Sequence, residues 1–227
     1  MKIKVIIFDV DGLMADTEYY QCKSIAELMS SYGVKLNHSY HAKLIGVSTK
    51  DNFLELKKRY NITENINTLL AAREKLYLKT IKASGIRAYP GLKEILEYAK
   101  KKGIKIAIGS SSVKTQINVV VPILIKSIGI RTPFRRYFDA IVTGSDVKKT
   151  KPAPDIYNLV SRKLGIAPHE CLVLEDSVSG VKAAKAAKMF CIAVKNRYSK
   201  NHDLNLADCI VKGLKEALKE IKKIGEI

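Results

Sequence analysis

The chain has 227 residues, of which 47% are hydrophobic, so it can bury the core of one large domain or of two small ones. Its apolar runs are too short to span a membrane, and the N-terminus lacks the layout of a signal peptide. We therefore expect a cytoplasmic protein with no membrane partner. The cysteines form no C-x-x-C pair, which predicts free thiols in a reducing compartment. They are Cys22, Cys171, Cys191 and Cys209.

The formal net charge is +18. Such an excess of cations is compatible with an anionic partner, either nucleic acid, a membrane surface or a phosphorylated metabolite. The lysines are spread over several predicted helices, and no nucleic-acid motif or aromatic-interleaved basic stripe occurs. We interpret the charge as a solvated surface and expect no nucleic-acid partner. A basic field could still attract a phosphorylated substrate.

The first predicted strand is Val5-Ile6-Ile7-Phe8, a short apolar run typical of a strand buried on both faces. It leads into Asp9-Val10-Asp11-Gly12. Two carboxylates two residues apart at a strand end can point to the same side, where they repel each other unless a cation lies between them. An oxygen-lined Mg²⁺ site is therefore predicted. The alternative is a polar turn, because Asp and Gly are common turn residues.

Residues 17 to about 84 show helical periodicity and no clear strand. Tyr89-Pro90-Gly91 then marks the end of this block. The pattern predicts a small helical unit inserted after the first strand. We expect two domains, a discontinuous core formed by residues 1–16 and 87–227 and a helical domain formed by residues 17–86.

From residue 91 onwards, predicted helices and strands alternate, which indicates a parallel sheet with right-handed crossovers. The predicted strands are 104–108, 140–142, 171–174, 189–194 and 209–211. The predicted helices are 91–102, 114–128, one ending at Leu164, 177–187 and 213–223.

Ligands of open α/β sheets bind beyond the carboxyl ends of the strands, so the residues after each strand are the candidates for a site. Besides the two aspartates, they are Ser110-Ser111-Ser112, Lys148, Lys149, Lys151 and Glu175-Asp176-Ser177. Carboxylates can hold Mg²⁺, while hydroxyls, backbone N–H groups and ammonium groups can hold phosphate. Lys148 or Lys149 could be mistaken for Lys151, although the following Pro-x-Pro favours Lys151. Glu175 could instead pair with a lysine.

Four motifs in consistent order resemble those of the haloacid dehalogenase superfamily of phosphatases and phosphomutases. They are Asp9-Val10-Asp11-Gly12, Ser110, Lys151-Pro152-Ala153-Pro154-Asp155, and Leu174-Glu175-Asp176-Ser177 with Gly180. The subgroup with a helical cap inserted after the first motif fits best. The resemblance implies an α/β fold with a Rossmann-like parallel sheet core and an inserted all-helical cap domain. We expect a monomer that acts on a small phosphorylated substrate.

The resemblance also implies a mechanism. Asp9 would be the nucleophile that becomes an aspartyl-phosphate, and Asp11 would be the general acid and base. The transferring phosphoryl group would be bound by Ser110, Ser111 and Lys151. Phosphoryl transfer depends mainly on positioning and on neutralisation of charge, which such a set supplies.

Mg²⁺ is the cofactor that the resemblance implies. It would be held by Asp9, the backbone carbonyl of Asp11 and Asp176, with Glu175 nearby. One departure from the family pattern lies just beyond this motif. Family members often carry Gly in the turn after the last motif's helix, where this chain has Lys188.

The cap would choose the substrate, and Leu44-Ile45-Gly46-Val47-Ser48 resembles the cap loop of β-phosphoglucomutases and sugar phosphatases. The candidate cap contacts are Gln21, Ser48, Thr49, Lys50 and Arg73. β-Phosphoglucomutases have a His where Gln21 stands and an Arg where Thr49 stands. Because only an Arg fork grips a distal phosphate bidentately, we predict a Mg²⁺-dependent phosphatase of a sugar phosphate or similar metabolite. The alternative is a β-phosphoglucomutase-like phosphomutase.

A receiver-type signalling domain is a rival from another class, since it also phosphorylates an Asp with the help of Mg²⁺, a hydroxyl and a lysine. The inserted helical block and the second carboxylate, Asp11, argue against it. Rapid turnover of a small phosphate ester would separate an enzyme from a receiver.

Overall fold

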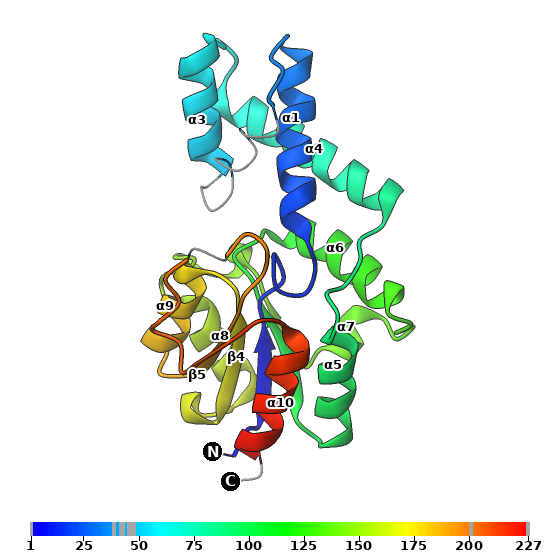
Figure 1. The fold of residues 1–227 in the computed structure, drawn as a ribbon, viewed down its shortest axis with the longest axis vertical. Coiled ribbons are helices and arrows are strands. Elements are labelled where there is room, and N and C mark those ends of the chain that lie inside the picture. Colours follow the sequence, from blue (N-terminus) through cyan, green and yellow to red (C-terminus); the bar gives the residue numbers. More distant parts are fainter. Residues whose placement is uncertain (1, 38–39, 41–43, 45–48, 200–201, 226–227) are drawn as a thin grey trace. The chain divides into compact units, whose positions relative to one another are not determined.

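A computed structural model describes residues 2–37, 40, 44, 49–199 and 202–225. The chain divides into two compact units (Figure 1). The core unit comprises Met1–Asp16 and Arg87–Ile227, and the helical unit comprises Thr17–Ile86. None of the described helices is long and apolar enough to cross a membrane.

The core unit is built on a six-stranded sheet in the order β3-β2-β1-β4-β5-β6, in which every pair of neighbours is parallel. The strands are β1 (Val5–Phe8), β2 (Lys105–Gly109), β3 (Ala140–Val142), β4 (Cys171–Glu175), β5 (Phe190–Val194) and β6 (Cys209–Val211). This confirms the predicted α/β class, and each strand begins and ends within one residue of its predicted bounds.

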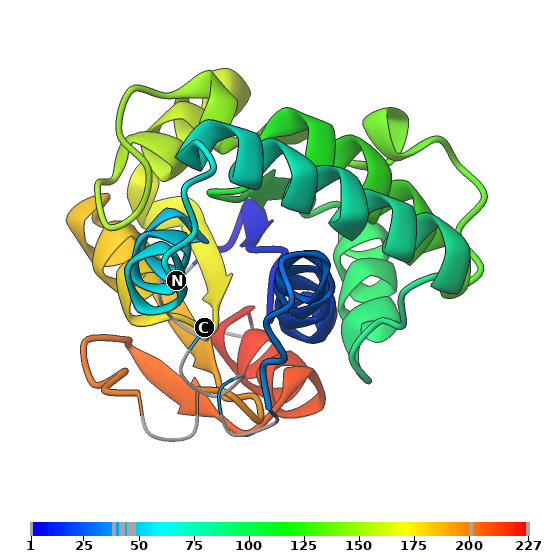
Figure 2. The same cartoon turned by 90° about the horizontal axis from the view of Figure 1, so that it is seen from above.

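The central strand β1 is apolar at every position because it is covered on both faces, and its four residues are all buried. Residues Val5 and Ile7 face a cluster that includes Ile156 and Val181 of the helices α8 (Asp155–Leu164) and α9 (Val178–Ala186). Helices α5 (Leu92–Lys101) and α10 (Leu214–Gly225) pack together on the other face (Figure 2). The sheet is therefore the middle layer of three.

A 14-residue helix, a short helix and two 3₁₀ turns complete the described part of the core unit. They are α6 (Lys114–Ser127), α7 (Phe134–Tyr137) and the 3₁₀ turns η1 (Gly144–Asp146) and η2 (Pro168–Glu170).

The register of β1 positions the site. Phe8 lies level with Ile108 on β2 and with Leu174 on β4. The residues that follow these three strand ends therefore emerge at one edge of the sheet. At β1 the chain changes from adding strands on one side to adding them on the other, and ligands bind beside such a strand.

The helical unit contains α1 (Thr17–Ser31), α3 (Thr49–Tyr60) and α4 (Ile66–Ser84), and it has an apolar cluster of its own. In α4 the buried residues recur every fourth position, as the sequence pattern predicts for one helix face. They are Leu69, Arg73, Tyr77 and Ile81. Tyr32 follows the end of α1 and is 39% exposed.

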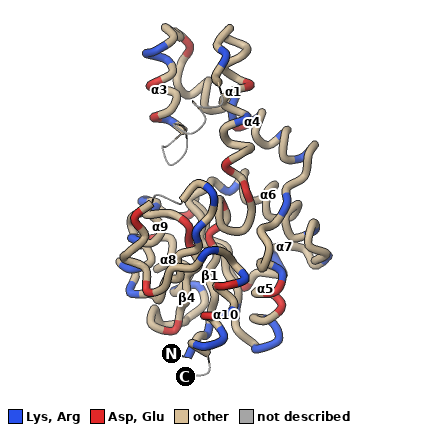
Figure 3. Tube along the Cα trace, viewed as in Figure 1, with Lys and Arg blue, Asp and Glu red and all other residues tan. Residues whose placement is uncertain are grey.

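The positive charge is distributed rather than gathered (Figure 3). Each described helix from α3 to α10 carries at least one Lys or Arg in its last turn. Cations there face the negative end of the helix macrodipole and stabilise it. Part of the positive charge therefore has a local structural explanation.

The turn after α9 keeps a left-handed residue although it has no glycine. Lys188 has φ +58°, its N–H donates to the Lys185 carbonyl, and the next N–H, from Met189, reaches back to Ala184. An L-residue with a Cβ is strained by about 1–2 kcal/mol in this region.

We expect Lys188→Gly to stabilise the protein by roughly 0.5–1 kcal/mol, since relief of strain exceeds the entropy that glycine adds to the unfolded chain. Thermal unfolding should show a melting temperature higher by roughly 1–4 °C. Lys188→Ala is the matched control, because it removes the same charge and keeps the Cβ. An equal gain from Lys188→Ala would show that charge, not backbone strain, limits stability at this turn.

Candidate active site

A buried lysine joins two acidic residues at the carboxyl edge of the sheet. The Nζ of Lys151 lies 2.5 Å from Asp9 Oδ1 and 2.5 Å from Glu175 Oε1. Asp9 follows β1, Glu175 ends β4, and Lys151 lies in the loop before α8. The side chain of Asp9 is 10% exposed, that of Glu175 is 0% exposed and that of Lys151 is 4% exposed. Both ion pairs are therefore shielded from water. Burial by itself would lower the pKa of Lys151, but the two carboxylates raise it, so the ammonium stays charged.

Glu175 is fully engaged in holding this lysine. Its Oε1 also accepts a hydrogen bond from the Tyr157 hydroxyl at 2.7 Å. Its Oε2 accepts from the Asp176 and Ser177 backbone N–H groups and from the Ser177 hydroxyl, at 3.0–3.2 Å. Gly180, on the first turn of α9, faces this carboxylate so closely that a Cβ would collide with it. Of the two interpretations of Glu175, its pairing with a lysine is the one that the structure contains.

The two acids that share Lys151 differ in their electrostatics. Burial raises the pKa of Asp9 to about 8; Lys151 opposes the shift, and the charges of Glu175 and Asp11 add to it. Burial also raises the pKa of Glu175, but Lys151 and the hydrogen bonds from Tyr157 and Ser177 outweigh it and hold that pKa below its usual value. Asp9 is therefore the carboxylate for which the site supplies too little positive charge.

Asp11, two residues beyond Asp9, is half-buried, and its Oδ2 accepts a hydrogen bond from the Ser112 hydroxyl at 2.6 Å. Ser110 is 1% exposed, and its hydroxyl accepts from the Ser112 backbone N–H at 3.0 Å. Ser111 is exposed. The serine loop after β2 therefore lies against the first motif, and its third serine makes the contact with the acid.

Asp176 approaches the first motif from β4. Its Oδ2 accepts a hydrogen bond from the Asn196 amide at 2.7 Å, and the same amide donates to the Gly12 carbonyl at 2.9 Å. Gly12 has φ +79°, and a Cβ there would collide with the Asp176 carboxylate. Glycine is required at this position for both reasons.

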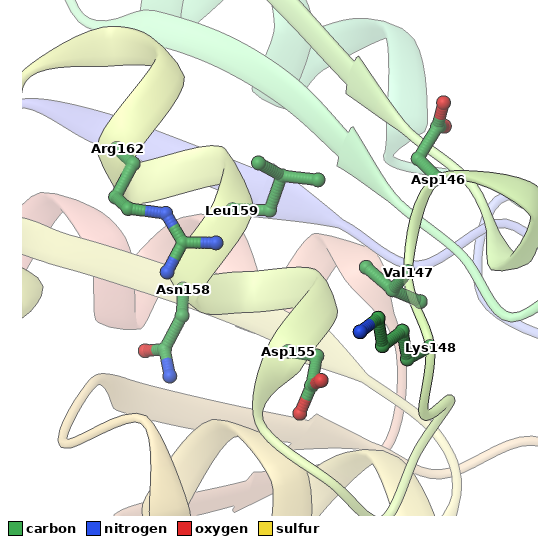
Figure 4. Close-up of a pocket in the computed structure, with 7 residues that line it drawn as sticks. All are labelled: Asp146, Val147, Lys148, Asp155, Asn158, Leu159 and Arg162. Atoms are coloured by element: carbon green, nitrogen blue, oxygen red, sulfur yellow. The ribbon is translucent and has the colours of Figure 1, made fainter.

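The structure separates Lys151 from its neighbours in the basic run. Lys148 lines a pocket of about 400 Å³ on the outer side of α8, together with residues such as Asp155 and Arg162 (Figure 4). Lys149 is exposed. Of these three lysines, Lys151 is the one that bonds to Asp9 within the described part of the chain. A second pocket, of about 620 Å³, lies beside Gly12 and Asn196 and extends to the start of α10.

The candidate substrate contacts lie in the helical unit. Gln21 on α1 and Arg73 on α4 are hydrogen-bonded to each other, and the Arg73 guanidinium lies 4.9 Å from the centre of the Tyr77 ring. Thr49 and Lys50 begin α3, where Thr49 is half-buried and Lys50 is exposed. Ser48 lies outside the described residues.

The acidic residues fit an open Mg²⁺ site better than a closed metal cage. Within the described ranges, no three His, Cys, Asp or Glu side chains gather as a ready-made metal cluster. Mg²⁺ needs no such cluster, since it usually keeps several waters and takes one or two carboxylates. The geometry that favours a cation is the Asn196 amide, which joins Asp176 to the Gly12 carbonyl beside Asp11 and so brings a third carboxylate to the first motif.

Two polar residues of the site, Tyr157 and Asn196, were not singled out from the sequence, and Ser112 was a candidate only as one member of the serine run. Ser112 stands in a run of three serines, and only the loop geometry decides which one faces Asp11. Tyr157 lies on the buried face of α8, where the sequence pattern predicts only that an aromatic residue packs in the hydrophobic core. Asn196 is 20 residues beyond Asp176 and follows a different strand, with no local signal to connect them.

A family model described as haloacid dehalogenase-like hydrolase matches residues 6–194, which is most of the chain. The chain belongs to this family. The predicted family and the prediction of a hydrolase are thereby confirmed.

Named relatives of this haloacid dehalogenase-like hydrolase match over most of their length. YhcW of Bacillus subtilis is 35% identical over 196 residues, covering 86% of this chain and 84% of the relative. The phosphorylated carbohydrates phosphatase of Thermotoga maritima is 30% identical over 203 residues, covering 89% and 88%.

A solved structure of CbbY from Rhodobacter sphaeroides in complex with phosphate is also similar to this hydrolase. It superimposes with a TM-score of 0.81 at 25% identity and covers 94% of this chain and 96% of its own. The fold is therefore shared over most of the chain.

We expect Tyr157→Phe to lower the free energy of unfolding by about 1.5–3 kcal/mol, since it removes a buried hydrogen bond to a charged acceptor. Urea denaturation followed by circular dichroism would measure the change. Tyr98→Phe on the half-buried face of α5 is the control, and it should change stability by less than about 0.5 kcal/mol. Equal effects of the two variants would mean that the Tyr157 hydroxyl contributes nothing to the Glu175 network.

Proposed function

We propose that this protein is a Mg²⁺-dependent phosphatase that hydrolyses a small phosphorylated metabolite, a sugar phosphate in the first instance, through an aspartyl-phosphate on Asp9. The observation that carries the proposal is the Lys151 ammonium 2.5 Å from Asp9 Oδ1 at the carboxyl edge of the sheet. A cation held by Glu175 beside a nucleophilic carboxylate is suited to a dianionic phosphoryl group.

In the first step, a carboxylate oxygen of Asp9 attacks phosphorus and the bond to the ester oxygen breaks. Asp11 gives its proton to that leaving oxygen. In the second step, Asp11 takes a proton from water and the water oxygen attacks the same phosphorus. The bond between phosphorus and Asp9 breaks, which releases inorganic phosphate and restores the Asp9 carboxylate. The Ser112 hydroxyl, bonded to Asp11 Oδ2, orients the acid and leaves Oδ1 to carry the proton.

Lys151 and the serine loop are proposed to bind the phosphoryl oxygens. Lys151 would neutralise charge, while Ser110 and the exposed Ser111 would donate hydrogen bonds from hydroxyl or backbone N–H groups. Glu175 is assigned to Lys151 rather than to a metal, since its oxygens already accept from Lys151, Tyr157 and Ser177.

Mg²⁺ would be held by Asp9, the backbone carbonyl of Asp11 and Asp176. When bound, it would neutralise phosphate oxygens so that one anion can approach another. The raised pKa of Asp9 supports the assignment, because a neutral Asp9 is a poor nucleophile and a nearby cation favours its ionised form.

The helical unit is proposed to act as the cap that selects the substrate, with Gln21, Thr49, Lys50 and Arg73 as candidate contacts. A phosphatase of phosphorylated carbohydrates among the relatives supports the choice of substrate class.

A mutase is the second candidate, since the structure of β-phosphoglucomutase from Clostridium difficile superimposes with a TM-score of 0.75 at 25% identity and covers 99% of this chain and 97% of its own. Water is favoured as the acceptor. Arg73 is 3% exposed and its guanidinium is bonded to Gln21 inside the helical unit, so it would contribute to a substrate contact through Gln21 and not as a bidentate grip on a distal phosphate.

We expect Asp9→Asn to lower turnover of p-nitrophenyl phosphate by roughly 10³-fold or more, because it removes the nucleophile. Asp11→Asn should cost roughly 10²–10⁴-fold, and with this good leaving group it should accumulate a phosphoryl adduct on Asp9. Intact-protein and peptide mass spectrometry would locate the adduct. Asp203→Asn, on an exposed loop, is the control. An adduct on Ser110 instead of Asp9 would overturn the mechanism.

To decide between phosphatase and mutase, the enzyme would be incubated with β-glucose 1-phosphate, Mg²⁺ and a trace of glucose 1,6-bisphosphate. We expect free phosphate to be the main product in phosphorus NMR. Fast formation of glucose 6-phosphate with almost no free phosphate would establish the mutase. If neither forms, release of phosphate from a panel of other sugar phosphates, acids and nucleotides would identify the substrate class.

A further inference from the structure

The side chain of Asn196, two residues beyond β5, uses its full hydrogen-bonding capacity. Its Oδ1 accepts from the Tyr198 N–H at 2.7 Å and from the Ser199 N–H at 2.9 Å. Its Nδ2 donates to the Gly12 carbonyl at 2.9 Å and to Asp176 Oδ2 at 2.7 Å. Both acceptor positions and both N–H groups of the amide are therefore satisfied.

These partners fix which way the amide faces. The two backbone N–H groups can only donate, so the carbonyl oxygen must face them, while the Gly12 carbonyl and the carboxylate can only accept from the NH₂ group. The turn is closed a second time by the Asn196 backbone N–H, which donates to the buried Ser199 hydroxyl at 2.9 Å. Asn196 thus presents two directed donors on a well-anchored turn.

The donors connect two separate parts of the site. One holds the loop after β1 through the Gly12 carbonyl, and the other holds the carboxylate that follows β4. The missing Cβ of Gly12 gives this carboxylate the room that it needs. An Asp side chain has two rotatable bonds, and this contact restricts both of them for Asp176.

We propose that Asn196 is a positioning residue that presents Asp176 to Mg²⁺, an inference that rests on the metal assignment of the proposed function. A ligating carboxylate is oriented by hydrogen bonds from residues that do not touch the metal, and loss of such a partner typically weakens metal binding 10- to 100-fold. A merely structural role in the 196–199 turn would instead leave metal affinity unchanged.

The test measures metal binding without turnover. Free Mn²⁺ would be followed by electron paramagnetic resonance as it titrates the wild type, Asn196→Ala, Asn196→Ser and Ser199→Ala, with no substrate present. In Asn196→Ser the hydroxyl can still accept a hydrogen bond from the Tyr198 N–H, which keeps the turn. The variant lacks the amide NH₂ group that donates to Asp176. Ser199→Ala loosens the same turn and leaves the Asp176 contact in place. Circular dichroism of the metal-free proteins checks that each variant is folded.

We expect the dissociation constant of Mn²⁺ to rise about 10- to 100-fold in both Asn196 variants and to stay at the wild-type value in Ser199→Ala. The Mg²⁺ concentration for half-maximal hydrolysis of p-nitrophenyl phosphate should rise by the same factor. If Asn196→Ala does not fold, Asn196→Ser decides.

The failures are distinguishable. A wild type that binds no Mn²⁺ would overturn the proposed metal site and the inference with it. A wild type that binds Mn²⁺ while the Asn196 variants bind it equally well would overturn the inference alone, as would an equal loss of affinity in Ser199→Ala.

Discussion

The site depends on one buried ammonium shared by two carboxylates. Removing Lys151, Asp9 and Glu175 from water is costly, and the cost is recovered only when the geometry is close and the remaining oxygens are satisfied. The structure meets both conditions, with two contacts of 2.5 Å and further donors to Glu175 from Tyr157, Ser177 and the backbone. Removal of Lys151 would leave two buried carboxylates with no cation between them, so the lysine is the member on which the cluster depends most.

The three aspartates of the site are held by different partners, which suits different tasks. Asp9 is buried against a cation, Asp11 is half-buried and accepts from Ser112, and Asp176 accepts from Asn196. A nucleophile, an acid–base group and a metal ligand need unlike surroundings, because their pKa values and freedom of movement must differ. The parallel sheet makes this possible, since each side chain follows a separate strand and meets its own loop at one edge.

The two units differ in what they offer. All residues to which we assign chemistry lie in the core unit, whereas the candidate contacts for the substrate lie on α1, α3 and α4 of the helical unit. The helical unit has its own apolar cluster, so its surface can vary without disturbing the core. The proposed division of roles is consistent with relatives that include a phosphatase of phosphorylated carbohydrates and a β-phosphoglucomutase, because one fold can carry different sites.

The sequence alone determined the α/β class, the strand positions and the edge of the sheet where Asp9 and Lys151 would meet. These follow from local periodicity and from the rule that parallel strands end together. It could not determine which of three serines faces Asp11, whether Glu175 serves a lysine or a metal, or that Asn196 would reach Asp176. Those outcomes depend on loop conformation and on contacts between residues far apart in the chain, for which no periodic signal exists. At Lys188 the chain adopts a left-handed conformation that a residue with a Cβ disfavours, held by local bonds at the end of α9.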